Sequence, residues 1–202
     1  PRPGNTSGGG AGGTILIAAG MLSGSGSMSA CGGAGYGSGG GGGGGRIAIY
    51  FEDINGFDLT NGVKAMGGTG GSLGGAGTVY WESANGLCKE LRLEGIGSAT
   101  GLTPLGALDV DRLVLTNSAA SIETNLHIQE IALINATASF LGTVTAENIS
   151  LTGTSIVTHA ASTVIQEYGL DLVVSNTLSI GSNSAIDVSG RGYLPGRTAG
   201  NI

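Results

Sequence analysis

Aromatic and charged side chains are both scarce in this chain. Phe, Trp and Tyr make up 4% of its 202 residues, and Asp, Glu, Lys and Arg make up 11%, whereas about a quarter of the residues in an average globular domain are charged. A core built on large aromatic side chains is therefore excluded, and Ala, Ile, Leu and Val must fill the interior. The formal net charge of −6 argues against nucleic acid and anionic membranes as partners.

Cysteine is limited to Cys31 and Cys88, and long apolar runs are missing. Two alternatives stay open for the cysteines, namely two separate small buried thiols or a disulfide that ties the first part of the chain to the second. No apolar run approaches the roughly 20 residues of a membrane-spanning helix, so we expect no membrane insertion. No signal peptide is recognisable, and we expect the chain to be a piece of a longer polypeptide.

A repeat of 18 residues runs through the stretch from Leu113 to Ile165. Its clearest column holds Leu113-Val114-Leu115, Ile131-Ala132-Leu133 and Ile149-Ser150-Leu151. Two more apolar columns accompany it, one of Ile122, Phe140 and Ile156, the other of Leu126/Ile128, Val144/Ala146 and Val164. Three short strands with alternating apolar positions in each period are typical of a solenoid. The sequence therefore predicts an all-β fold, a right-handed parallel β-helix whose coils stack about 4.8 Å apart.

Glycine is abundant, and 29 of the 42 glycines lie in residues 1–77. A pair of small residues, a polar residue and an alternating strand recur there at intervals of 32, beginning at Gly12, Gly44 and Ala76. We expect these to be β-helix coils with glycine-rich excursions at residues 32–45 and 67–77. Two alternatives remain for the excursions, either an ordered layer of extended threefold helices like polyproline II or mobile loops.

Changes in glycine content and repeat length divide the chain into three parts. Residues 1–81 hold glycine-rich coils of period about 32 with poly-glycine loops, and residues 82–190 hold regular coils of period about 18–21. Residues 191–202 begin a further glycine-rich segment. The last regular coil is expected to have its three columns at Leu170/Leu172, Leu178/Ile180 and Ile186/Val188, with a bulged corner near His159.

Three motifs carry a family resemblance. Gly-Gly-Arg-Ile-Ala-Ile-Tyr-Phe at 44–51, Gly-Gly-Ala-Gly-Thr-Val-Tyr at 74–80 and Ile-Asp-Val-Ser-Gly-Arg-Gly-Tyr-Leu at 186–194 resemble motifs of very large, repetitive, glycine-rich bacterial surface proteins. Those proteins are similar to adhesins of the pectate-lyase-like parallel β-helix superfamily. The resemblance covers nearly the whole chain and is specific to architecture. It implies an extracellular or cell-surface location and a structural or adhesive role.

Carboxylates are scattered along the chain, with the densest group at Asp109 and Asp111. A polysaccharide lyase needs clustered carboxylates for Ca²⁺ and a basic residue on one outward face, and a glycosidase needs two facing carboxylates. The polar residues that fall near one column are Asp111, Gln129 or Glu130, and Glu147. Weak Ca²⁺ or sugar contact there is the alternative to a solvated corner. We expect no catalytic residue, no resident metal and no cofactor.

The remaining polar candidates are histidines and asparagines. His127 lies between two inward-facing residues and should point outward, and we expect His159 on the surface as well. Asn5, Asn135 and Asn148 head Asn-X-Ser/Thr tripeptides, which are either chance matches or glycosylation acceptors. The glycine strings lack the Lys-Ser/Thr of a phosphate-binding loop, so no nucleotide site is expected.

These observations favour a non-catalytic structural segment of a secreted bacterial fibre, sheath or adhesin. Its expected partners are further copies, neighbouring repeats of a longer chain, or surface glycans. One alternative is a carbohydrate-binding module that uses exposed Ser/Thr faces and the aromatics Tyr50, Tyr80, Trp81 and Tyr168. The other is a polysaccharide lyase or hydrolase that depends on Asp109 and Asp111.

Overall fold

The computed structural model describes residues 6–84, 88–97 and 101–197. All regular secondary structure in these ranges is β-strand, and they contain no helix long and apolar enough to cross a membrane. The strands are β1 (Thr14–Ser23), β2 (Met28–Ser29), β3 (Arg46–Asn55), β4 (Val63–Lys64), β5 (Thr78–Ser83), β6 (Lys89–Glu94), β7 (Leu102–Leu105), β8 (Arg112–Thr116), β9 (Ala119–Ile122), β10 (Leu126–Ile134), β11 (Thr137–Phe140), β12 (Val144–Thr152), β13 (Ile156–His159), β14 (Leu172–Ile180) and β15 (Ala185–Ile186).

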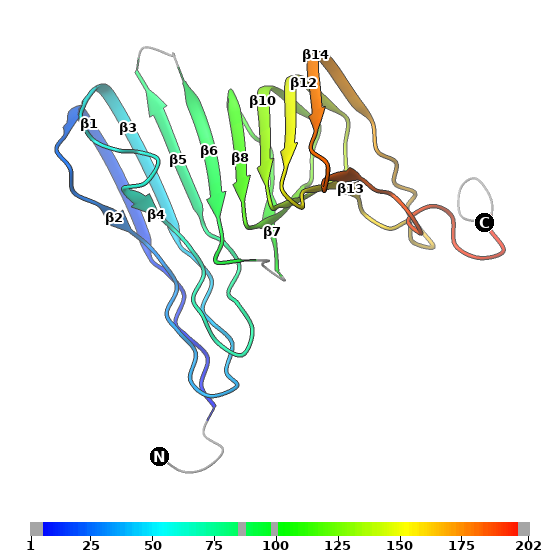
Figure 1. Ribbon diagram of the computed structural model, residues 1–202, viewed down its shortest axis with the longest axis horizontal. Coiled ribbons are helices and arrows are strands. Elements are labelled where there is room, and N and C mark those ends of the chain that lie inside the picture. The colour runs from blue at the N-terminus through cyan, green and yellow to red at the C-terminus, as the bar shows by residue number, and fades with distance from the viewer. Residues whose placement is uncertain (1–5, 85–87, 98–100, 198–202) are drawn as a thin grey trace.

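One large sheet spans the molecule (Figure 1). It has eight strands in the order β1-β3-β5-β6-β8-β10-β12-β14. A five-stranded sheet, β15-β13-β11-β9-β7, and a two-stranded sheet, β2-β4, complete the fold. Among the strands named above, every pairing is parallel except that between β5 and β6, which is antiparallel. Alternate residues of a strand face opposite sides of the sheet, but in β10 and β12 the inward positions shift by one residue in mid-strand, between Ile128 and Ile131 and between Ala146 and Ile149.

The prediction of a closed right-handed parallel β-helix is wrong, because each repeat contributes two strands and not three. The column of Leu126 and Ile128 and the column of Ile131 and Leu133 lie in one continuous nine-residue strand, β10. β12 joins the corresponding columns in the same way. The three predicted columns thus collapse into two facing sheets with open edges.

The fold departs from a β-helix in a second way. The face of the large sheet that is covered by another sheet changes between β5 and β6. Val79 and Trp81 of β5 pack into the core under β2 and β4, whereas Tyr80 between them packs against the other core. Leu91 and Leu93 of β6 belong to that other core, which the five-stranded sheet covers. One sheet therefore carries two cores on opposite faces, and no single interior runs through the chain.

The 18-residue alignment is confirmed within the regular part. Leu113 pairs with Ile131, and Ile131 pairs with Ile149, so the aliphatic columns stack as predicted. The residue directly after β8, β10 and β12 has a positive φ. These residues are Asn117 (φ 47°), Asn135 (φ 51°) and Gly153 (φ 67°), which are 18 residues apart. Asn is one of the few side chains that tolerate this backbone region.

The predicted alignment of the last coil is wrong by one column. Leu172 pairs with Val144, while Leu178 pairs with Ile149 across a bulge in the ladder. The residues before β14 form a loop instead of a strand, so Leu170 does not stack under Ile149 as expected. The sequence pattern does not separate the two alternatives, because an aliphatic-x-aliphatic pattern occurs both at Leu170-Asp171-Leu172 and at Leu178-Ser179-Ile180.

The second column also differs at its C-terminal end. Phe140 pairs with His159 and not with Ile156. Alternation along β13 turns Val157 and His159 inward, so the His159 side chain is 4% exposed and Ile156 is 38% exposed. The expectation of a surface histidine at 159 is therefore wrong.

The glycine-rich segments leave the sheet as a separate arm, which extends toward the N-terminus (Figure 1). Residues 32–35 and 66–69 form outgoing limbs, and residues 6–13, 39–45 and 71–77 form limbs that return to strands β1, β3 and β5. Hydrogen bonds between the return limbs recur every third residue. They run from Gly9 to Gly40, Gly12 to Gly43, Gly41 to Ser72 and Gly44 to Gly75, with N–O distances of 2.8–2.9 Å.

A three-residue period is that of the polyproline II helix, so the arm is a bundle of extended threefold helices that bond to one another. Of the two alternatives, the structure has the ordered layer. The packing requires glycine at the contacts: a Cβ built on Gly42 would collide with the carbonyl oxygen of Gly10, and one on Gly45 with that of Gly13. Gly10 itself faces open space.

Candidate functional site

Two hollows lie on uncovered faces of the large sheet. The first is an acidic groove of about 470 Å³ across the strands β10, β12 and β14. Its polar lining comprises Asp109, Asp111, His127, Gln129, Thr145, Glu147 and Ser175. The structure therefore brings together the acids that the column alignment placed near one another.

Both aspartates of this groove have contacts within the chain. Asp109 forms an ion pair with the Lys89 Nζ at 2.7 Å, and Asp111 accepts a hydrogen bond from the Lys89 backbone amide at 2.8 Å. These contacts hold the loop before β8 against β6. Among the described residues, no group of three His, Cys, Asp or Glu side chains is arranged to hold a metal ion. The polar side chains of the groove can therefore form hydrogen bonds with water or a solute.

The remaining candidates from the sequence lie apart. Cys31 and Cys88 are both free thiols, and burial raises the pKa of Cys88. Asn5 lies outside the described residues. The Asn135 side chain accepts a hydrogen bond from the Thr154 amide at 3.2 Å, and the Asn148 side chain accepts one from Asn176 at 2.9 Å.

The second hollow lies over β1, β3 and β5, on the face that β2 and β4 leave open. It has a volume of about 390 Å³, and its lining comprises Ala18, Ala19, Gly20, Tyr50, Phe51, Glu52, Glu82 and Ala84. The strand register sets Ala18, Tyr50 and Glu82 side by side on three neighbouring strands. Tyr50 is 41% exposed. Tyr50 therefore lies between the small Ala18 and the acidic Glu82, and its ring forms an aromatic wall of the hollow.

Tyr80 stands beside this hollow and supports it. Its ring centroid lies 5.8 Å from that of Tyr50, with the planes tilted by 59°, a usual geometry for an aromatic pair. The Tyr80 hydroxyl donates a hydrogen bond of 2.6 Å to the Glu82 carboxylate. Burial, reinforced by this bond to an anion, raises the pKa of Tyr80 well above its ordinary value. Glu82 is therefore held in place at the edge of the hollow.

The other two predicted aromatics do not join this pair. Trp81 points to the opposite face of the sheet, where the Arg92 guanidinium lies 5.0 Å from its ring centroid. Tyr168 lies in the loop before β14, where its amide bonds the Ser162 hydroxyl. The alternation of side chains along a strand predicts that Tyr80 and Trp81 face opposite sides. It does not predict the contact between Tyr50 and Tyr80, which depends on the register of β3 and β5.

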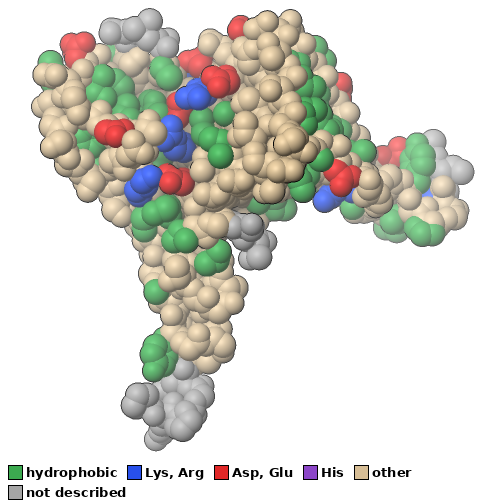
Figure 2. Space-filling view, viewed as in Figure 1, with side chains coloured by type: hydrophobic (Ala, Val, Ile, Leu, Met, Phe, Trp, Pro, Cys, Tyr) green, Lys and Arg blue, Asp and Glu red, His purple; other side chains and the backbone are tan. Residues whose placement is uncertain are grey.

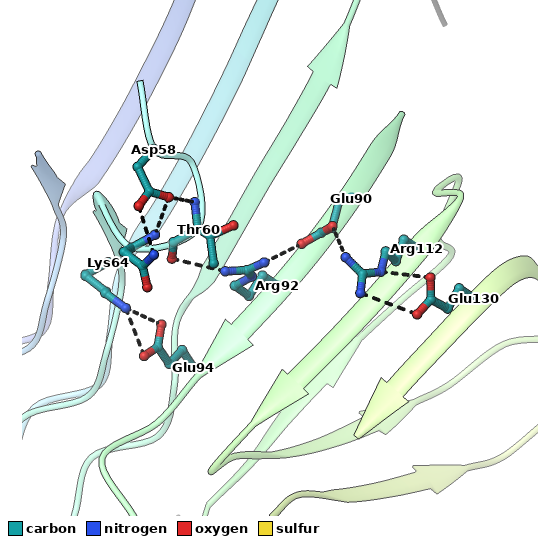
Figure 3. Close-up of polar contacts among 9 residues, drawn as sticks. Asp58, Thr60, Lys64, Glu90, Arg92, Glu94, Arg112 and Glu130 are labelled. Atoms are coloured by element: carbon teal, nitrogen blue, oxygen red, sulfur yellow. Dashed lines mark hydrogen bonds and ion pairs between the residues drawn. The ribbon is translucent and has the colours of Figure 1, made fainter. Parts of the chain in front are cut away.

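A row of ion pairs on the opposite face was not anticipated (Figure 3). Glu90, which is 3% exposed, bonds Arg92 at 2.9 Å and Arg112 at 3.1 Å. Arg112 continues the row to Glu130, and Arg92 donates to the Thr60 carbonyl. This row closes the side of the core under β4. The alternation of charged and apolar residues in 89–94 was the signal for it.

Charged side chains gather over the middle of this face, whereas the glycine arm carries few of them (Figure 2). Lys64 of β4 and Glu94 of β6 add a further pair at 2.7 Å. These pairs connect β6 to β4 and β8, and β8 to β10, which indicates a structural role.

Comparisons with protein-family models, with curated proteins and with solved structures found no match for this chain. Its function is therefore inferred from the geometry above.

Proposed function

We propose that this chain is a non-catalytic structural segment of a secreted bacterial surface fibre, sheath or adhesin. The observation that carries the proposal is the large sheet with an open strand at each end. Within the described part of the chain, β1 and β14 are the end strands of this sheet and each pairs with a single neighbouring strand. Such edges present unpaired backbone groups to any further strand. Extension of the sheet by another copy, or by neighbouring repeats of a longer chain, satisfies them.

Exposed apolar side chains at both ends support this assembly. On β14, Val173 is 51% exposed and Leu178 is 43% exposed, and on β1 Leu16 is 72% exposed. An added strand would cover part of this apolar area, which is favourable by about 25 cal/mol per Å².

The glycine arm supports a mechanical role. Its limbs are joined by backbone hydrogen bonds and carry few reactive or charged side chains. The arm therefore provides an extended, closely packed layer. A cell-surface or extracellular location, with glycans or further copies as partners, follows as part of the same proposal.

The test compares assembly of the purified chain with that of edge variants. V173K and L178K together place two charges on β14, and an edge lysine opposes strand addition. V164K, in a loop outside the strands, is the matched control. Light scattering and electron microscopy should show filaments or large assemblies for the parent chain and V164K, and dispersed particles for the double variant. Monomers at all concentrations for the parent chain would contradict the proposal.

A carbohydrate-binding module is the second candidate, favoured by the Tyr50–Tyr80 pair beside an open hollow. A glycan array probed with the parent chain tests it. Y50L serves as the variant, because an aromatic face is the feature on which a sugar ring would stack. Array signals that are unchanged in Y50L would remove this site from the proposal. For the polysaccharide lyase or hydrolase, the groove at Asp109 and Asp111 offers no argument beyond the acids themselves.

A further inference from the structure

The hollow over β1, β3 and β5 combines a space, an aromatic wall and a charge of one sign. The space exists because Ala18, Gly20 and Ala84 are small where neighbouring strands carry Tyr50 and Glu52. A Cβ built on Gly20 would lie 3.8 Å from a Glu52 carboxylate oxygen, so this carboxylate lies over the glycine. The volume of about 390 Å³ falls in the range of small-molecule sites, which is about 300–1,000 Å³.

The electrostatics of the lining are those of an anionic site. Glu52 and Glu82 both line the hollow, and none of the described residues in its lining is Lys, Arg or His. Lys89 stands opposite Glu82 in the β5–β6 ladder and interacts with it electrostatically, but its ammonium is bound to Asp109 at 2.7 Å. Glu82 is bound by the neutral Tyr80 hydroxyl, which leaves its negative charge uncompensated by this contact.

We propose that this hollow binds an organic ammonium ion, such as an alkylated or protonated amine. The face of an aromatic ring attracts a cation through its quadrupole, and Tyr50 supplies an exposed ring at the wall of the hollow. The Glu52 and Glu82 carboxylates supply the countercharge. The floor of Ala18 and Gly20 accepts the methyl or methylene groups that surround the nitrogen.

Two other classes of ligand fit the same hollow less well. An anion would meet two carboxylates and, in the part of the lining that the structure describes, no basic side chain. A neutral sugar could donate its hydroxyls to Glu52 and Glu82, but it would gain nothing from their charge. The hollow includes residues of the open edge strand β1, but its lining residues lie on the face of the sheet, so the proposal does not require an added strand at either edge.

The test is a titration monitored by NMR or calorimetry with matched cationic and neutral probes. Choline is compared with 3,3-dimethylbutan-1-ol, which has the same shape without the charge. Glucosamine is compared with N-acetylglucosamine, whose nitrogen is neutral. We expect choline to bind with a Kd on the order of millimolar and at least tenfold more tightly than the neutral alcohol, with binding weakened by salt. Glucosamine binding in addition would identify an amino sugar as a source of the ammonium group.

Variants locate the site. E52Q and Y50L should each weaken choline binding about fivefold or more. D53N removes a charge from the same strand outside the hollow, and Y36L removes an exposed tyrosine from the glycine arm, so both should leave binding unchanged. Thermal unfolding checks that every variant is folded. Equal binding of the cationic and neutral probes, absence of choline binding, or an unchanged Kd in both E52Q and Y50L would overturn the proposal. Failure of filament assembly would leave this result unaffected.

Discussion

Gly42 lies where two glycine limbs touch, and its missing side chain is what allows their contact. A Cβ there would collide with the Gly10 carbonyl, whereas a Cβ on Gly10 would meet nothing within 4 Å. G42A should therefore lower the free energy of unfolding by about 1–3 kcal/mol through overpacking. G10A should be neutral or stabilise by about 0.4–1 kcal/mol, because alanine restricts the unfolded chain. Urea titrations of the two variants measure the difference, and equal values would show that the limbs do not pack as described.

Tyr80 links the stability of the protein to alkaline pH. Burial and the bond to Glu82 raise its pKa above the ordinary value of 10.0. The native state therefore keeps this proton when the unfolded chain loses it, so the stabilisation is fully present below pH 10 and declines as the pH rises above 10. Y80F removes this group, and its stability should fall less steeply between pH 9 and 11 than that of the parent chain. Parallel curves for the two proteins would contradict the assignment.

At the scale of the element, Glu90 of β6 is the charge whose loss matters most. It is 3% exposed and holds both Arg92 and Arg112. E90A should destabilise the protein by roughly 3 kcal/mol, because it leaves Arg92 partly buried without its carboxylate. E94A, on the same strand and face, removes one pair with Lys64 whose side chains are 28% and 25% exposed, and it should lose about 1 kcal/mol or less. Thermal or urea unfolding ranks the two, and an equal loss would contradict the role of burial.

The sequence predicts the strands better than it predicts their connection. Alternation and the 18-residue spacing identify the stacking of Leu113 on Ile131, because side-chain period and repeat length are local properties. They do not reveal that Ile128 and Ile131 share one strand, since a corner and a continuous strand can carry the same residues. The antiparallel step from β5 to β6 also lacks a local signal, because residues on either side of it still alternate.

The candidate site shows the same limit. Tyr50 and Glu52 alternate with buried residues and are readily predicted to face outward. Their meeting with Tyr80 and Glu82 depends on the register between β3 and β5. The hydrogen bonds at every third residue between the glycine limbs that lead into these strands continue the same register. That contact is a property of the assembled sheet.

For the whole molecule, the two cores on opposite faces predict two units of local stability. Ile49 is fully buried in the core under β2 and β4, and Leu133 is fully buried in the core under the five-stranded sheet. The two clusters share no residue, and the strands meet at the β5–β6 ladder. Truncation to alanine at either site should destabilise its own core by about 2–5 kcal/mol.

Hydrogen exchange read by mass spectrometry distinguishes the two units. I49A should speed exchange in β1, β3 and β5 while β10 and β12 stay protected, and L133A should do the reverse, because local opening follows contiguous packing. The antiparallel β5–β6 ladder has few residue pairs to transmit the loss. Uniformly faster exchange across all strands in both variants would instead show one cooperative unit, and the reversal of the covered face would then have no consequence for stability.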